Sequence, residues 1–183
     1  VMKNETVFKR FQAVANKRKD APFLQVLRET ALIYDINDGD ISYSDMQKAV
    51  NVWELKFRNA GYSHGHRVGL LLQNRPIFIE IWLALNSIGI SVVPINPDLR
   101  VAELEYIIEH SEMKLIISTP ERILELKQAV INKNLTVDVI STFDEMPNIL
   151  EVDNKIFDPD TSTECALLYT SGTTGQPKGC ILS

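Results

Sequence analysis

The sequence is poor in the features that mark secreted proteins. Only two of its 183 residues are cysteines, Cys165 and Cys180, which is too few for a disulfide framework. This scarcity favours a reducing compartment. The first residues also lack the pattern of a secretory signal or a transit peptide. We therefore expect a cytoplasmic protein.

An excess of positive charge and a long apolar run are also missing. The formal net charge is −5 and the pI is near 5.2, so the chain lacks the excess of basic residues that is typical of nucleic-acid-binding proteins. The longest run without a charged residue, 81–97, has 17 residues and includes Gly89 and Pro94. It is marginal for a membrane span, and its breaks argue against one. The 45% hydrophobic fraction suits the core of one domain, or part of a larger one.

Residues 1–61 are predicted to form a helix, a hairpin and a second helix. Apolar residues recur at helical spacing over 4–18. Residues 30–36 are apolar enough for a strand, and we expect it to pair as a hairpin with a short return strand over 41–43.

The second helix is expected to begin at Ser44. Ser44 and Gln47 fit a capping box, in which both side chains bond the free amides of the first turn. Gly61 is a natural stop, so the helix should run to about Ala60.

Residues 62–142 alternate between apolar strands and amphipathic helices. This order predicts an α/β fold with a largely parallel, Rossmann-like sheet flanked by helices. The strands are expected over 68–72, 91–95, 115–117 and 137–140, and the helices over 76–89, over 101–110 and from Thr119 and Pro120 onward. Residues 143–163 are acidic and without periodicity, so we expect a surface excursion. Residues 164–183 then read as strand, loop and strand.

The loop in this last segment combines four hydroxyl residues, three glycines, a proline and a lysine. Glycine permits tight bends, and successive backbone N–H groups in such a bend form an anion-binding concavity. A flexible linker has a similar composition. The apolar strands on both sides favour a structured, phosphate-binding loop instead. A Walker loop is excluded, because Pro177 precedes Lys178 and Gly179 follows it. The candidate binding residues are Thr170, Ser171, Gly172, Thr173, Thr174, Gly175, Gln176, Pro177 and Lys178.

Other chemically capable residues have simpler structural interpretations. The two cysteines are expected to be small buried residues on strands. His64 and His66 lack further metal ligands nearby, so a solvated turn is expected there, and no metal site is assigned. His110 should lie on the polar side of its helix. The remaining expectations are packing roles for Trp53 and Trp82, and a solvated helix face for Glu103, Glu105, Glu109 and Glu112.

Several motifs together resemble the adenylate-forming superfamily, especially its acyl-CoA synthetases. The loop from Thr170 to Gly179 is similar to that family's phosphate loop. The other matching stretches occur in the family's order. They are Ile41-Ser42-Tyr43-Ser44-Asp45-Met46, Arg67-Val68-Gly69-Leu70-Leu71-Leu72-Gln73-Asn74-Arg75-Pro76, Ile88-Gly89, Val93-Pro94-Ile95-Asn96-Pro97, Glu103-Leu104-Glu105-Tyr106-Ile107 and Asp158-Pro159-Asp160. The sequence departs from the family at His66, where an aspartate is usual, and at Cys180, where valine is common.

The resemblance implies the N-terminal part of the large domain of an ATP-dependent acyl-CoA synthetase. Such enzymes use ATP, Mg²⁺ and coenzyme A to activate a small-molecule carboxylate. The rest of the family's machinery would lie after Ser183, so the C-terminal remainder of the same enzyme is an expected partner and the chain alone is expected to be inactive. A homo-oligomer is left open. The alternative is a non-catalytic domain that binds nucleotide or a partner. An unrelated Rossmann nucleotide binder is disfavoured, because no G-x-G-x-x-G follows the first parallel strand.

Overall fold

A six-stranded sheet forms the centre of the protein. The computed structural model describes residues 5–149, 156–170 and 177–183. The strand order is β6-β5-β3-β4-β7-β8, and every neighbouring pair is parallel except β7 and β8. The strands are β3 (Arg67–Leu71), β4 (Ser91–Pro94), β5 (Leu115–Ser118), β6 (Asp138–Ser141), β7 (Ala166–Thr170) and β8 (Lys178–Leu182). The predicted α/β fold with a largely parallel sheet is confirmed.

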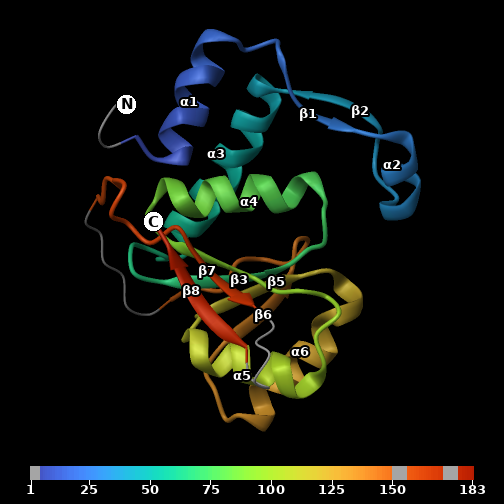
Figure 1. The fold of residues 1–183 in the computed structure, drawn as a ribbon, viewed down its shortest axis with the longest axis vertical. Coiled ribbons are helices and arrows are strands. Elements are labelled where there is room, and N and C mark those ends of the chain that lie inside the picture. Colours follow the sequence, from blue (N-terminus) through green and yellow to red (C-terminus); the bar gives the residue numbers. More distant parts are fainter. Residues whose placement is uncertain (1–4, 150–155, 171–176) are drawn as a thin grey trace.

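Helices cover both faces of this sheet. Figure 1 shows α1, α3 and α4 above it and α5 and α6 below it. Both faces of the central parallel strands β3, β4 and β5 are therefore shielded from water, and their residues are largely apolar on both sides. The helices are α1 (Val7–Lys17), α3 (Tyr43–Asn59), α4 (Pro76–Ser87), α5 (Val101–Ser111) and α6 (Ile123–Asn132), with a short 3₁₀ turn, η1 (Pro120–Arg122), before α6.

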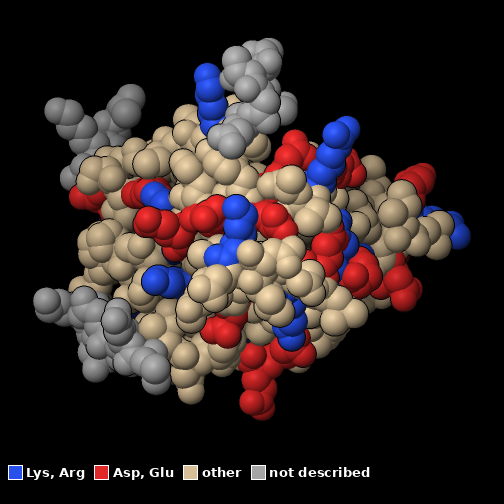
Figure 2. Space-filling view, turned by 90° about the horizontal axis from the view of Figure 1, so that it is seen from below, with Lys and Arg blue, Asp and Glu red and all other residues tan. Residues whose placement is uncertain are grey.

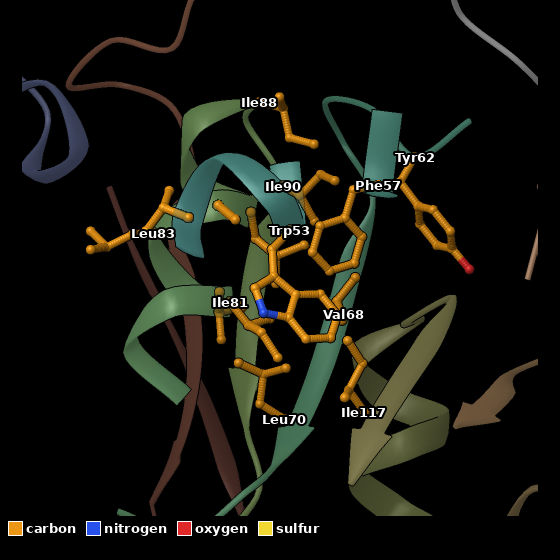
Figure 3. Packing of buried hydrophobic residues seen from close by; sticks show 14 of the residues in the cluster. Trp53, Phe57, Tyr62, Val68, Leu70, Ile81, Leu83, Ile88, Ile90 and Ile117 are labelled. Atoms are coloured by element: carbon orange, nitrogen blue, oxygen red, sulfur yellow. The ribbon is translucent and has the colours of Figure 1, made fainter. Parts of the chain in front are cut away.

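The core consists of two apolar layers separated by the sheet. Leu70 joins the layer under α3 and α4, whereas its neighbour Leu71 joins the layer over α5 and α6. This alternation follows from the two-residue period of a strand. Figure 3 shows the upper layer, where the rings of Trp53 and Phe57 gather with Val68 and Leu70. Burying one such side chain stabilises the fold by about 1.5–3 kcal/mol.

The N-terminal hairpin prediction was wrong. Residues 28–34 form a helix, α2 (Arg28–Tyr34), where a strand over 30–36 was expected. Leu32 and Ile33 are 77% and 75% exposed, so these apolar residues were not drawn into a sheet. The helix ends at Asp35, whose left-handed backbone (φ 50°) lets its N–H bond the carbonyl of Ala31.

The strand that does pair in this region lies earlier in the chain. β1 (Pro22–Val26) is antiparallel to β2 (Gly39–Ser42), and α2 lies between them in sequence. Figure 1 shows this two-stranded sheet and α2 extending away from the central sheet as an arm. Arg75, at the start of α4, ties the arm down. Its Nη1 donates to the carbonyl of Tyr34 at 2.9 Å. Its guanidinium also lies over the ring of Tyr34, 4.7 Å from the ring centre, as a cation–π contact.

Helix α3 begins before the expected cap. Ser42, not Ser44, is the N-cap, and its hydroxyl accepts from the backbone N–H of Asp45 at 3.1 Å. The Ser42 hydroxyl also donates to the Asp45 carboxylate at 2.7 Å, so the residue paired with the cap is Asp45 and not Gln47. Gln47 instead donates to Asn51 along the helix. Asp45 suits the first turn because a negative charge is favourable there.

The remaining elements lie close to their predicted positions. The helix predicted over 76–89 is observed as Pro76–Ser87, and Pro76 occupies its first turn as a proline can. Thr119 precedes the η1 turn as expected, but its side chain makes no capping hydrogen bond. The described parts of the predicted excursion, 143–149 and 156–162, contain no helix or strand. No helix in the described ranges is long and apolar enough to cross a membrane.

The lower surface carries charges of both signs. Figure 2, seen from the side of α5 and α6, shows acidic and basic side chains interspersed there. Glu109 on α5 pairs with Lys133 after α6 at 2.9 Å, and Glu105 accepts from Asn132 at 2.6 Å. Glu109 and Glu112 are exposed, whereas Glu103 and Glu105 are half-buried. The predicted solvated acidic face is thus only partly solvated.

Candidate functional site

The candidate loop is held between two strands paired in register. β7 leads into it and β8 leads out, and Thr170 at the end of β7 lies directly opposite Lys178 at the start of β8. The two predicted strands that flank the loop are therefore observed, and they pair antiparallel. Of the candidate residues, Thr170, Pro177 and Lys178 are described. Ser171, Gly172, Thr173, Thr174, Gly175 and Gln176 lie outside the described residues.

The three described loop residues differ in exposure. Pro177 is buried, whereas Thr170 and Lys178 are exposed. Within the described ranges, Lys178 forms no ion pair with a carboxylate. Its ammonium group is thus available to a bound anion. Pro177 has a fixed φ and no N–H to satisfy, which suits a buried position just before the strand.

A groove opens beside Thr170. It has a volume of about 410 Å³ and lies where β3, β4 and β7 end. Ligands of open α/β sheets bind at these carboxyl ends of the strands. Two of the stretches that resemble the adenylate-forming family meet here, although sequence reasoning gave neither a site role. The lining residues are Leu70, Leu72, Gln73, Asn74, Phe78, Pro94, Ile95, Asn96, Pro97, Leu168, Tyr169 and Thr170.

The backbone at the groove has an unusual conformation. Gln73, two residues after the end of β3, lines the groove and has a left-handed φ of 59°. A non-glycine residue in this region is uncommon, and such residues gather at functional sites. Gln73, Asn74 and Asn96 add amide groups to an otherwise apolar lining. An apolar cleft with a few polar groups is the usual composition of a small-molecule site.

A histidine and a tyrosine connect the loop to the lower helices. The hydroxyl of Tyr169 lies 2.7 Å from Nδ1 of His110 on α5, and the two rings meet edge to face. Tyr106 also stacks on the ring of His110, with ring centres 5.2 Å apart. His110 is exposed, as predicted, but it also contacts the strand that carries the loop. The sequence offered no signal for this contact, because 59 residues separate the pair.

Gly179 explains how closely the two strands of the loop pack. A Cβ there would lie 3.1 Å from Cδ1 of Leu167 and 3.4 Å from Cε1 of Tyr169. Gly179 is also the register partner of Tyr169. A side chain at position 179 would therefore press on Leu167 and make ordinary contact with the ring of Tyr169.

The cysteines are less buried than expected. Cys165 is half-buried just before β7, and Cys180 is exposed on β8, so the prediction of two buried thiols was wrong. All of β8 is exposed, whereas β6 at the opposite edge of the described sheet is mostly buried. Burial raises the pKa of Cys165, which disfavours the reactive thiolate.

The histidines near residue 65 have packing roles. Nδ1 of His66 accepts from the backbone N–H of Ser63 in a turn, as predicted. His64 stacks on Phe157 with ring centres 3.6 Å apart. Among the described residues, no three His, Cys, Asp or Glu side chains form a group that could hold a metal ion. The tryptophans also pack as expected: Trp53 is buried, and Trp82 is half-buried with its Nε1 donating to Asn86.

A larger cavity lies under the arm. It has a volume of about 510 Å³ between β2, the start of α4 and the ends of β3 and β5. Its charged groups are Arg75 and Glu80, together with Asp38 just before β2 and Asp40 within it. Arg75 already bonds Tyr34 and Gln73, and burial raises the pKa of Glu80. Three carboxyl groups line this cavity, whereas none of the described residues that line the groove beside Thr170 is charged, so the cavity is less suited to phosphate.

Comparison with known proteins gives a consistent result. The family model described as AMP-binding enzyme matches residues 11–183. A crotonobetaine/carnitine–CoA ligase from Salmonella paratyphi A is 30% identical over 173 residues, covering 85% of this chain and 33% of the relative. The chain thus spans about a third of the length of the curated relatives that it matches.

Solved structures share the fold. McyG A-PCP, complexed with phenylalanyl-adenylate, superposes with a TM-score of 0.74 at 26% identity, over 100% of this chain and 29% of that one. A fatty acyl CoA synthetase from Mycobacterium tuberculosis has a TM-score of 0.70 at 20% identity, over 98% and 34% of the two chains. The resemblance read from the motifs is confirmed. Because the family model matches nearly the whole sequence, this chain belongs to the family of AMP-binding enzymes.

Proposed function

We propose that this chain supplies the ATP phosphate-binding loop of an AMP-forming acyl-CoA ligase. In the first step, the carboxylate of the acid attacks the α-phosphate of ATP and pyrophosphate leaves. In the second, the thiol of coenzyme A attacks the acyl-adenylate and displaces AMP. The observation that carries this proposal is the pairing of β7 with β8, which places Thr170 opposite Lys178, a lysine without an ion pair to any described carboxylate.

The loop would act on the leaving group. Lys178 would offset negative charge on the departing pyrophosphate, and Thr170 would donate a hydroxyl hydrogen bond. The same role is proposed for Ser171, Thr173 and Thr174, with Gly172 and Gly175 bringing backbone amides close to the β- and γ-phosphates. Gln176 and Pro177 complete the loop. Catalysis here would rest on positioning and charge stabilisation, because no nucleophile or base is needed from these residues.

The other reactants would need residues beyond this segment. ATP would bring Mg²⁺, which supplies charge neutralisation at the phosphates. Among the described residues, no three His, Cys, Asp or Glu side chains form a metal-binding group, and the resemblance places the carboxylate that would serve Mg²⁺ further along the enzyme. Coenzyme A and the C-terminal remainder of the enzyme would complete the site. We accordingly propose that residues 1–183 alone do not turn over. The cytoplasmic location and a homo-oligomer remain predictions.

The substrate would be a small-molecule carboxylic acid. The likeness to a ligase named for crotonobetaine and carnitine makes these the first acids to test. The assay is acid-dependent exchange of labelled pyrophosphate into ATP, using the protein from the complete reading frame that contains residues 1–183. Exchange that requires one acid from a panel of carnitine-type, short-chain, long-chain and aryl acids supports the proposal. Failure of every acid to promote exchange would contradict it.

The second candidate is a non-catalytic nucleotide-binding domain. The short span relative to the ligases favours this reading for residues 1–183 by themselves. Titration of ATP into this segment, alongside the exchange assay, separates the two. Binding of ATP without exchange by the segment, together with exchange by the complete protein, is the result that we expect.

A further inference from the structure

We propose that His110 is a positioning residue that fixes both ends of the phosphate loop through the hydroxyl of Tyr169. The inference rests on the proposed function, because it assigns this pair a role in holding ATP. His110 itself would touch neither the nucleotide nor the acid. Its effect would pass through one side chain, Tyr169, to the two described loop ends, Thr170 and Lys178.

Tyr169 is placed to control both strands of the loop. It directly precedes Thr170 on β7, and it faces Gly179 on β8 in the register. Its ring lies beside Gly179, with 3.4 Å between Cε1 and the position of a Cβ at that glycine. Since Gly179 follows Lys178, Tyr169 adjoins one loop end along its own strand and the other across the strand pair.

The tyrosine ring is held at its hydroxyl by α5. The 2.7 Å contact with Nδ1 of His110 has the length of a good O–H to N hydrogen bond. Burial raises the pKa of Tyr169 to about 12, so the phenol keeps its proton at neutral pH and can donate it. Without this bond, rotation about the Cα–Cβ bond would be opposed by packing alone.

The ring of His110 is itself packed against a second aromatic residue of α5. Tyr106, one turn earlier on α5, stacks on the His110 ring at an angle of 25°. The opposite face of α5 is anchored by Leu104, Ile107 and Ile108, which are buried in the lower layer of the core. His110 therefore transmits the rigidity of a packed helix to the end of β7. A site on rigid elements holds its geometry better than one on loops.

A surface contact without any effect on ATP binding would have the same distances. The test must therefore separate a positioning role of His110 from such a contact. Our design uses a double-mutant cycle in the complete protein. His110→Phe keeps an aromatic ring but removes Nδ1, and Tyr169→Phe removes only the hydroxyl. His110→Asn retains a polar group near the Nδ1 position. Glu109→Gln is the matched control, because Glu109 neighbours His110 on α5 but pairs with Lys133, away from the loop.

The readouts are the Kd for ATP by calorimetry, the KM for ATP in pyrophosphate exchange, and the thermal midpoint. One hydrogen bond is worth roughly a fivefold change. We expect each Phe variant to raise the Kd and KM for ATP by about that factor, with the acid KM unchanged and the midpoint lowered by only about 2–4 °C. The double variant should be no worse than either single one, and His110→Asn and Glu109→Gln should stay within about twofold of wild type.

Several results would overturn the inference. Unchanged ATP affinity in Tyr169→Phe, additive effects in the double variant, or an equal loss in Glu109→Gln would each do so. The proposed function fails differently. If the wild-type protein binds ATP but no acid promotes exchange, the proposed ligase reaction is wrong. The Kd values of the variants for ATP would then still decide the role of His110. If the wild type does not bind ATP, both ideas fall.

Discussion

At the scale of single residues, backbone conformation and charge pairing determine which positions tolerate change. Gly89 has a φ of 77°, and Phe157 covers the space where its side chain would be. Arg67 and Glu164 form a two-pronged ion pair, at 2.7 Å and 3.0 Å, that ties the start of β3 to the segment before β7. Each feature holds distant parts of the chain together, and each can be tested alone.

Replacing Gly89 with alanine should destabilise the protein by about 2–3 kcal/mol. The new Cβ would be strained at positive φ, which costs about 1 kcal/mol, and it would lie 2.6 Å from Cδ1 of Phe157. Gly65→Ala is the control, since Gly65 has a φ of 89° with nothing within 4 Å of a Cβ. Urea unfolding measures both. Equal losses in the two variants would show that the Phe157 contact carries no energy.

The Arg67–Glu164 pair should make stability depend on pH. The hydrogen bond from Arg67 lowers the pKa of Glu164 in the folded protein. The ion pair therefore stabilises the fold fully above the pKa of glutamate in the unfolded chain, about 4.3. This stabilisation is lost as the pH falls through the folded pKa. Glu164→Gln should lower the free energy of unfolding by about 1 kcal/mol at pH 7 and by much less at pH 3. Chemical unfolding at both values measures this. The same cost at both pH values would contradict the pairing argument.

At the scale of elements, helix ends and exposed apolar residues separate the correct predictions from the wrong ones. The strands and helices from β3 to β6 were predictable because continuous apolar runs and helical periods alternate there. The segment over 30–36 was not, because Leu32 and Ile33 suggested a buried strand but lie exposed on α2. The start of α3 was misplaced because Ser42 and Ser44 both precede a polar residue by three positions, and sequence alone did not choose between them.

The two serines provide a direct test of where α3 begins. Ser42→Ala should lower the unfolding free energy by about 1 kcal/mol, because it removes the side chain that accepts from Asp45 N–H. Ser44→Ala should change it by only a few tenths, since only the backbone of Ser44 bonds, to the carbonyl of Lys19. Thermal unfolding of both variants compares them. A larger loss for Ser44→Ala would restore the original prediction.

At the scale of the whole molecule, the fold brings separate motifs to one edge of the sheet. The loop was recognised from local composition, since glycines, hydroxyls and a lysine mark an anion site wherever they lie. The groove beside Thr170 was not foreseen, because its walls come from the ends of three strands far apart in sequence. The contact between His110 and Tyr169 was missed for the same reason. Local chemistry is readable from sequence, whereas convergence of distant residues depends on the sheet order.

The central claim is that Lys178 neutralises charge on the pyrophosphate leaving group. The most direct measurement is ATP–pyrophosphate exchange by the complete protein carrying Lys178→Ala, compared with Lys127→Ala, which removes an exposed lysine on α6. Loss of one charged group that stabilises the transition state should slow exchange by roughly tenfold to a hundredfold. Lys127→Ala should exchange at the wild-type rate. If Lys178→Ala exchanges as fast as wild type, Lys178 does not stabilise the leaving pyrophosphate and the proposed role of the loop is wrong.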